Sequence, residues 1–532
     1  MPHLVLELRK PAKWPFGSGR GYSRGFHEED CLRKVKASVL LSLILFVYAG
    51  LGLATMITRA PWCDEAWFGN PAYNLAYKGY MGTTVLDPAS STWKSVKLTG
   101  IDRHTYWVMP GNLLLNAVIF RLFGFGSFQM RAPSLLWGAA ALLAWWVILR
   151  RLTGRAELAL AGVALVAIDY HFQMQAADGR MEMMTVGLGY CAIAVYLALR
   201  ERSLLLAVAA SQAVSAAACF THPNGVLLAL QLIGATLFFD GKSVRFKTLL
   251  VAALPYVLFA AGWGLYIAQS PSDFAAQFLG NASGRGPTFL TPMAAIQAEI
   301  TERYMNNFGL AGWASRSGRL NLLPLIVMLG GTIGAASMRA IRRQKGVLLI
   351  LLWTLLAILY LTGLEGLKTH FYLLYATSLY SVLVAIVAFW LWENRPQWRI
   401  GVAAVLTIFV ALQAGRTVVL ASRNPKGVSY EPAVRYLREH FDRNTFIMGG
   451  GGLLFALGPD WNILDDYRLG YNTGKRADVI VIDGQWDDSI QMLSPPIYAH
   501  VERVLASEYH EAYRQGGYRI LVRSQRASAP AA

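Results

Sequence analysis

The sequence predicts an α-helical polytopic membrane protein with a small C-terminal α/β soluble domain, and three observations lead to this fold class. Hydrophobic residues make up 55% of the 532 residues and charged residues only 15%, against about 45–50% and about 25% in soluble proteins. Apolar runs of about 17 to 23 residues, a length that crosses a bilayer, recur between residues 37 and 420. From residue 422 onward, 13 Lys or Arg balance 13 Asp or Glu, as in a soluble domain.

The apolar runs divide the chain into three parts. The first 36 residues hold eight Lys and Arg, and the run that follows lacks the small-residue site of a cleaved signal peptide. We therefore expect a cytoplasmic N-terminal segment over 1–36, a transmembrane domain over 37–421 and a soluble domain over 422–532. About eleven transmembrane helices are predicted, at 37–58, 128–149, 156–172, 181–199, 203–220, 224–240, 248–268, 320–338, 346–363, 370–392 and 398–420.

The distribution of positive charge sets the predicted orientation. With the N-terminus inside, the five short loops on the cytoplasmic side contain 14 Lys or Arg, and the three on the other side contain only Arg180 and Lys368. Cytoplasmic loops carry the positive excess, so the net charge of +17 indicates a cytoplasmic membrane surface and no nucleic-acid partner. The soluble domain is then expected on the opposite, outer side of the membrane.

The apolar run 111–123 is too short to cross the bilayer comfortably. If it crossed, every later loop would change sides and the positive residues would face outward, so we expect an interfacial helix. It belongs to a first external loop, 59–127, which also contains a predicted helix at 65–78. A second external segment, 269–319, contains a helix-like stretch at 293–307. Loops of this length are typical of lids and binding segments.

The soluble domain is expected to alternate helices and strands. A helix is predicted at 431–441, and strands are predicted at 445–448, 479–482 and 518–522. The glycines at 449–452 resemble a phosphate loop, but they lack the Lys-Ser/Thr of a P-loop and the spaced glycines of a Rossmann turn. A flexible turn is expected there instead.

Two adjacent carboxylates, Asp64 and Glu65, follow the first span directly, inside an aromatic-rich stretch. Partial desolvation where the chain leaves the bilayer raises a carboxylate pKa toward the range that a general base needs. The alternative interpretation is an interfacial Asp64 that acts as the N-cap of the helix 65–78.

Other polar residues are predicted to gather at the same membrane face. Ionisable groups at membrane depth are costly and mark functional sites, so we expect an outward-facing polar cavity whose cations suit an anionic, phosphate-bearing ligand. For several of them a structural role stays open: a surface ion pair between Asp178 and Arg180, a capping role for His222, and interfacial anchoring by Lys368 and His370. The candidates are Arg103, His104, Arg131, Asp178, Arg180, His222, Lys368, His370 and Tyr372.

The sequence contains no recognisable metal motif. Its four cysteines are scattered without a CxxC pair, and no DxD, HExxH or comparable spacing of His and carboxylates occurs. We therefore expect no metal ligands and isolated thiols.

The arrangement resembles the GT-C superfamily of integral-membrane glycosyltransferases. The similarity rests on Asp64-Glu65 after the first span, a long external loop with interfacial helices, the stretch 109–112, Phe123-Gly124 and 131–134. It covers roughly residues 37 to 420 and is densest from 61 to 190. Within the superfamily, the chain looks most like the bacterial proteins related to protein O-mannosyltransferases and the lipid A aminoarabinose transferase.

The resemblance implies transfer of a sugar from a polyprenyl-phosphate donor to a glycan, lipid or protein acceptor, with inversion and without a metal cofactor. The active site and the C-terminal domain would then lie on the periplasmic side of a bacterial inner membrane. Asp64 would be the general base, and Glu65 its neighbour that shapes the site. Arg131, Asp178 and Arg180 match positions where relatives have conserved polar residues. The basic-aromatic entrance to a late span, near the donor phosphate, is matched by Lys368, His370 and Tyr372.

The chain also departs from the family pattern. Met109-Pro110-Gly111-Asn112 lacks the histidine and the second proline of the relatives. The aminoarabinose transferase branch has a lysine close to this element, and the residues of this chain that could take its place are Arg103 and His104. The alternative functions are a multi-span transporter or lipid flippase with an outward-facing polar cavity, and a non-catalytic scaffold. Transporters often show paired halves, and this sequence shows no such repeat; in a scaffold, Asp64→Asn would leave function intact.

Overall fold

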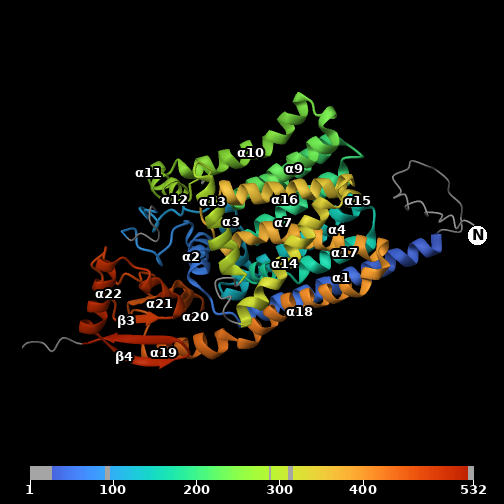
Figure 1. The fold of residues 1–532 in the computed structure, drawn as a ribbon. Coiled ribbons are helices and arrows are strands. Elements are labelled where there is room, and N and C mark those ends of the chain that lie inside the picture. Colours follow the sequence, from blue (N-terminus) through green and yellow to red (C-terminus); the bar gives the residue numbers. More distant parts are fainter. Residues whose placement is uncertain (1–26, 90–95, 287–288, 309–315, 525–532) are drawn as a thin grey trace, which may run out of the picture.

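A computed structural model describes residues 27–89, 96–286, 289–308 and 316–524, and it places a bundle of long helices beside a small sheet (Figure 1). These residues include ten helices that are long and apolar enough to cross a membrane, so the α-helical polytopic fold is confirmed. The bundle helices are α1 (His27–Thr58), α4 (Ser127–Thr153), α5 (Ala156–Ala167), α6 (Tyr170–Ala176), α7 (Glu182–Leu199), α8 (Leu204–Thr221), α9 (Gly225–Asp240), α10 (Phe246–Ile267), α14 (Arg316–Ser337), α15 (Arg339–Arg342), α16 (Lys345–Gly363), α17 (Leu374–Asn394) and α18 (Arg399–Arg423).

The predicted span 156–172 is not one continuous helix, and this expectation was wrong. Helix α5 has 12 residues, about 18 Å at 1.5 Å per residue, against about 30 Å of hydrocarbon. Directly after α5, the Asp169 carboxylate accepts the Phe172 N–H at 2.9 Å and so caps the start of the short helix α6. Thr377 and Gln413 donate to the same carboxylate. Sequence hydropathy did not register this buried cap.

The two ends of the bundle differ. The sheet lies at one end, and α1 begins near the opposite end (Figure 1). Basic short loops meet at that opposite end, where Arg151 lies 3.7 Å from Glu201 and Arg155 pairs with Glu393. This separation matches the predicted sorting of charge. Which side of a membrane each end faces stays a prediction.

The bundle core is built around α7 and α17, whose residues are mostly buried. Helix α10 has no buried residue in its most apolar window and exposes Leu249, Leu254 and Leu258. In a bilayer such a surface contacts lipid. Helix α10 therefore lies at the edge of the bundle (Figure 1).

Both external segments contain the expected helices. Helix α2 (Cys63–Lys78) ends at Gly79, whose φ of +79° favours glycine. Helix α3 (Pro110–Phe123) exposes Leu114, Val118, Leu122 and Phe123 on one side, and its interfacial position stays a prediction. The second segment forms α11 (Pro271–Phe274), η3 (Ala275–Leu279), α12 (Gly280–Gly284), α13 (Pro292–Ala298) and η4 (Glu299–Met305).

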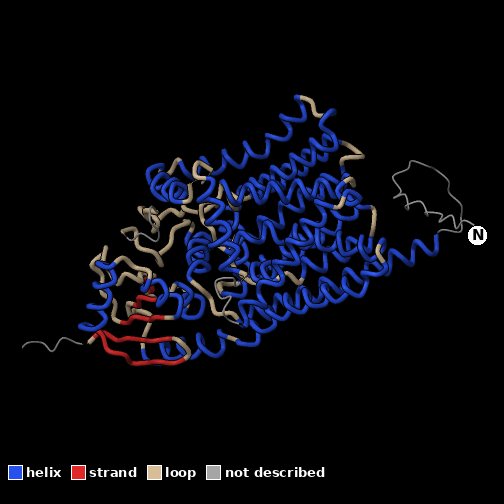
Figure 2. Tube along the Cα trace, in the orientation of Figure 1, coloured by secondary structure: helices blue, strands red, loops and turns tan. Residues whose placement is uncertain are grey.

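The C-terminal domain has a mixed five-stranded sheet in the order β2-β1-β3-β5-β4 (Figure 2). The pairs β2–β1 and β1–β3 are parallel, and β5 runs antiparallel to both of its neighbours, β3 and β4. Three of the strands and helix α19 were predicted. The elements of the C-terminal domain are α19 (Glu431–His440), β1 (Ile447–Gly449), η9 (Gly451–Leu453), α20 (Leu454–Leu457), β2 (Ile463–Leu464), β3 (Val479–Ile482), α21 (Gly484–Gln491), α22 (Pro495–Glu508), β4 (Tyr509–Gln515) and β5 (Tyr518–Arg523).

The glycine-rich segment after β1 was expected to be a flexible turn, but Gly451–Leu453 form the 3-10 helix η9 and are packed. Gly451 and Gly452 are buried. A Cβ atom on Gly452 would lie 2.5 Å from the Pro61 carbonyl oxygen, so only glycine fits this close approach.

The C-terminal domain and the first external loop share one hydrophobic core. Trp67 and Phe68 of α2 pack in the same buried cluster as Ile447, Leu453 and Val479 of the sheet region. The domain is therefore held against the helix that begins with Cys63 and Asp64.

Candidate active site

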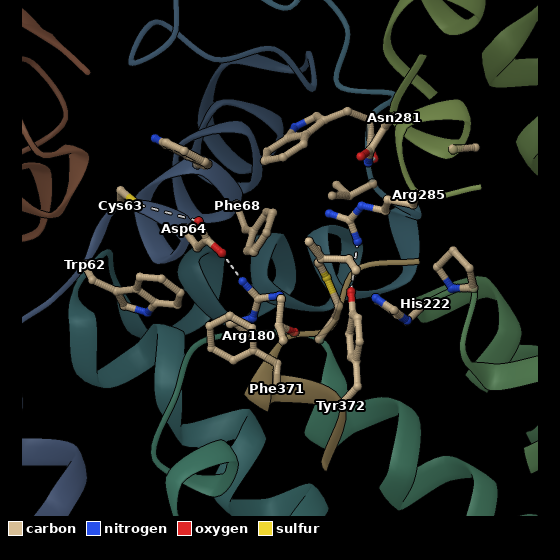
Figure 3. Close-up of a pocket in the computed structure, with 18 of the residues that line it drawn as sticks. Trp62, Cys63, Asp64, Phe68, Arg180, His222, Asn281, Arg285, Phe371 and Tyr372 are labelled. Atoms are coloured by element: carbon tan, nitrogen blue, oxygen red, sulfur yellow. Dashed lines mark hydrogen bonds and ion pairs between the residues drawn. The ribbon is translucent and has the colours of Figure 1, made fainter. Parts of the chain in front are cut away.

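A cavity of about 960 Å³ lies where the bundle, the external segments and the C-terminal domain meet. Figure 3 shows Asp64 on one side of this cavity and Arg285 on the other. The polar residues that line it from the transmembrane part and its loops are Asp64, Arg180, His222, Asn224, Asn281, Arg285, Glu365, Thr369 and Tyr372. The C-terminal domain adds Asp465, Tyr467, Arg468, Gln485, Trp486, Ser489 and Ser494.

Asp64 presents its carboxylate to this cavity. The Arg180 guanidinium forms an ion pair with Oδ2, and the Cys63 thiol lies 3.6 Å from Oδ1. The side chain is 17% exposed, so a substrate can reach it. The alternative role as an N-cap was wrong, because the N-cap is Trp62 and the carboxylate that accepts its N–H, at 3.2 Å, belongs to Glu65.

Glu65 points away from the cavity into a buried ion pair. Its two oxygens accept hydrogen bonds from Nε and Nη2 of Arg131, both at 2.6 Å, and Oε1 also accepts one from the Gly179 N–H at 2.9 Å. Burial by itself would raise the pKa of the Glu65 carboxyl, but the Arg131 charge and these hydrogen bonds hold that pKa below its usual value. Arg131 also donates to the carbonyls of residues 56, 59 and 60 at the end of α1. This pair therefore fixes α2 to α1 and α4 and does not face a substrate.

Arg180 lies between two carboxylates. In addition to Asp64 it donates to Glu182, with an Nη2–Oε1 distance of 2.5 Å, and its guanidinium lies 3.9 Å from the centre of the Phe371 ring. Its charge is thus shared, and its position is fixed from three sides. The geometry suits a group that orients the Asp64 carboxylate.

Asp178 does not pair with Arg180, contrary to the ion pair considered from the sequence. It accepts hydrogen bonds from Arg59 at 3.2 Å and from the Trp62 indole at 3.1 Å. Burial raises the pKa of the Asp178 carboxyl to about 6, against the attraction of Arg59. It fixes the chain between α1 and α2.

The opposite wall of the cavity carries a second cation. The Arg285 guanidinium donates to the Tyr372 hydroxyl at 2.9 Å, and the His222 ring lies 5.5 Å from the Tyr372 ring (Figure 3). His222 also accepts the Asn224 N–H at 3.0 Å, so it is both a cap and a cavity residue. Burial lowers the pKa of His222 to about 4, which leaves a neutral imidazole at pH 7. Sequence analysis missed Arg285, although it stands alone between two glycines in the second external segment.

Lys368 is placed outside the cavity lining, and its ammonium group is already satisfied. It donates to the carbonyls of Leu361, Thr362 and Glu365 at 2.7 to 2.8 Å and lies 3.2 Å from Glu299. The group therefore ends α16 and ties it to η4. It is not placed as a phosphate ligand.

Three further candidates also lie away from this cavity. Arg103 and His104 line a second cavity of about 340 Å³ between α3, α8 and α10. The His370 ring is tilted by 40° against the Phe371 ring, with 4.0 Å between the ring centres, and His370 is not among the residues that line the first cavity. The structure therefore gathers Asp64, Arg180, His222 and Tyr372 and separates the other candidates from them.

No protein-family model and no curated protein matches the chain. Its fold matches ArnT from Cupriavidus metallidurans bound to undecaprenyl phosphate, with a TM-score of 0.58 and 13% identity over 92% of this chain and 99% of ArnT. The apo state of ArnT gives a TM-score of 0.59 at 15% identity, over 91% and 98% of the two chains. The Archaeoglobus fulgidus oligosaccharyltransferase in its apo form gives 0.53 at 12% identity, over 92% and 75%.

These solved structures are GT-C glycosyltransferases, so the chain has the GT-C fold that its sequence resemblance implied. Among them, both states of ArnT are matched over nearly their whole length. At these identities the likeness concerns the fold, and the chemistry has to be argued from the cavity.

Proposed function

We propose that this protein is a membrane glycosyltransferase that moves a sugar from a polyprenyl-phosphate donor to an acceptor hydroxyl. The observation that carries the proposal is the placement of Asp64 in one cavity with the Arg285–Tyr372 pair (Figure 3). A carboxylate and a cation on facing walls are the two groups that this transfer needs. ArnT, which shares the fold, was solved with undecaprenyl phosphate bound.

The proposed chemistry follows from this arrangement. Asp64 takes the proton of the acceptor hydroxyl while the hydroxyl oxygen bonds to the anomeric carbon, and the bond from that carbon to the phosphate oxygen breaks. Arg285 and the Tyr372 hydroxyl stabilise the negative charge that develops on the departing polyprenyl phosphate. Direct displacement of this kind inverts the anomeric configuration. Arg180 keeps the Asp64 carboxylate oriented.

We also propose that the reaction needs no metal ion. Arg285 supplies positive charge to the phosphate side of the cavity, where the Tyr372 hydroxyl lies beside it. Within the described part of the chain, no group of three or more His, Cys, Asp and Glu is placed to hold a metal. The donor is then a co-substrate, and no cofactor is required.

The site lies at the end of the bundle that the charge pattern assigns to the outside. We therefore place the reaction at the periplasmic face of a bacterial inner membrane, with the donor tail among the lipid-facing helices. The acceptor is a glycolipid, a polysaccharide or a protein.

The test is transfer by the purified protein in nanodiscs, supplied with a panel of labelled polyprenyl-phosphate sugars and crude membrane acceptors. The native chain is compared with Asp64→Asn and with Arg285→Ala. We expect one donor to be consumed by the native chain, no transfer by Asp64→Asn although it binds the donor, and weakened donor binding by Arg285→Ala. Binding without consumption of any donor by the native chain, together with passage of lipid across the membrane, would favour a flippase instead.

A further inference from the structure

The C-terminal domain contacts the first two turns of α2 directly, through the buried carboxylate of Asp465. Its Oδ2 accepts the Trp67 indole N–H at 2.9 Å and the Gly451 N–H at 2.9 Å, and its Oδ1 accepts the Trp486 indole N–H at 3.0 Å. Trp67 lies on α2, three residues after Asp64, whereas Trp486 lies on α21. One carboxylate therefore joins the helix that bears Asp64 to two elements of the domain.

Further contacts surround this junction. The Gln485 amide donates to the Cys63 thiol at 2.8 Å, and the Asp465 backbone N–H donates to the Val85 carbonyl at 2.8 Å. A Cβ atom on Gly451 would lie 3.0 Å from the Ala66 Cβ, so the start of η9 approaches α2 closely. The start of α2 is thus held from the domain side as well as from the Arg131 side.

Two attachments with different partners hold the start of α2 next to Asp64. Glu65 fixes the helix to the bundle through Arg131, and Trp67 fixes it to the domain through Asp465. Asp64 directly precedes Glu65, lies three residues before Trp67 and faces the cavity. Its direction therefore depends on both attachments.

We propose that Asp465 is a positioning residue for the reaction, and that the C-terminal domain completes the active site by holding α2 through this carboxylate. Asp465, Gln485 and Trp486 also line the cavity, so separation of the domain from α2 would open the site as well as release the helix. The catalytic part of this proposal rests on the proposed function, whereas the attachment itself does not.

The chain offers a matched control at the next residue. Asp466 is also buried in the C-terminal domain, but within the described part of the chain its oxygens accept the N–H groups of Arg468, at 3.2 Å, and Gly470, at 3.0 Å, and not a donor on α2. Asp466→Asn therefore removes a buried carboxylate of the same loop without touching α2. Trp67→Phe removes the indole donor from the other partner and keeps an aromatic ring.

The first readout is the reaction of Cys63 with a small water-soluble maleimide, followed by peptide mapping on the full-length protein in nanodiscs. Cys63 is 7% exposed and lies beside the junction. An Asn side chain offers one acceptor oxygen and a nitrogen that cannot accept, so at least one of the three hydrogen bonds is lost. We expect Asp465→Asn and Trp67→Phe each to speed alkylation about tenfold or more, because each variant loses a hydrogen bond to a charged group. Because they break the same contact, the double variant should not exceed the faster single variant.

The second readout is sugar transfer by the same preparations. Asp465→Asn should lower kcat while donor binding stays within about twofold, and Asp466→Asn should retain native kcat and native Cys63 reactivity. Native reactivity of Cys63 in Asp465→Asn, or an equal rise in Asp466→Asn, would overturn the proposal. If alkylation responds as expected but the native chain transfers no sugar, the attachment stands and the proposed function fails.

Discussion

The neighbouring carboxylates Asp64 and Glu65 should respond in opposite ways to loss of charge. Glu65 accepts four hydrogen bonds and faces a guanidinium that is 1% exposed. Glutamine would turn an amide nitrogen, which cannot accept, toward N–H donors and would leave Arg131 buried without its counter-charge. Removing one partner of a buried pair costs about 3–5 kcal/mol. We therefore expect Glu65→Gln to lower the stability of the protein by about this amount.

Asp64→Asn should have a much smaller effect on stability. Asp64 is part-exposed, and Arg180 keeps its contacts with Glu182 when the Asp64 charge is removed. The loss of one such contact costs about 1 kcal/mol. The same substitution should abolish transfer, since the asparagine amide cannot take a proton from the acceptor.

The assay is thermal unfolding of both variants in identical nanodiscs, followed by intrinsic fluorescence, next to the transfer assay. Glu65→Gln should melt clearly below the native protein, whereas Asp64→Asn should melt close to it and be inactive. A low melting temperature for Asp64→Asn with a native one for Glu65→Gln would refute the division into a cavity carboxylate and a structural carboxylate.

Three other predictions follow from the site. Burial holds His222 neutral and lowers its pKa from 6.5 to about 4. Its contribution to stability is therefore complete above pH 6.5 and is lost as the pH falls toward 4, and a lowering of the pKa by about 2.5 corresponds to about 3 kcal/mol. The melting temperature of His222→Asn should depend less on pH in this window than that of the native chain. Lys368→Met should leave three carbonyls at the end of α16 without their donor and lower the melting temperature, whereas the donor KM should stay native; a raised donor KM with native melting would instead assign Lys368 to the phosphate. Transfer should survive dialysis against EDTA, and restoration of lost activity by a divalent ion would contradict the metal-free proposal.

The sequence predicted the parts of the fold that composition and periodicity determine. Most of the spans, helix α3 in the apolar run 111–123 and three strands of the sheet follow from where apolar residues lie. Strand β4 was missed because its segment 509–515 is largely polar and exposed at the sheet edge, and β2 because it has only two residues. The break at Asp169 was missed because one capping carboxylate hardly changes the mean hydropathy of its run.

The site was predicted only in part, because its decisive contacts join distant parts of the chain. Asp64 and Glu65 were recognised together, but adjacent residues on a helix point about 100° apart, and only the tertiary structure shows which one meets Arg131. Arg285 reaches Tyr372 across 87 positions, and Asp465 reaches Trp67 across 398. Lys368 looked like a phosphate ligand because the carbonyls that surround it carry no signal in the sequence.

The central claim is that the cavity between Asp64 and the Arg285–Tyr372 pair receives the donor phosphate. The most direct measurement is a cryo-EM structure of the full-length protein in nanodiscs with undecaprenyl phosphate. The account predicts the phosphate within hydrogen-bonding distance of the Arg285 guanidinium and the Tyr372 hydroxyl, on the wall that faces Asp64. A phosphate bound instead in the second cavity, beside Arg103 and His104, would contradict it.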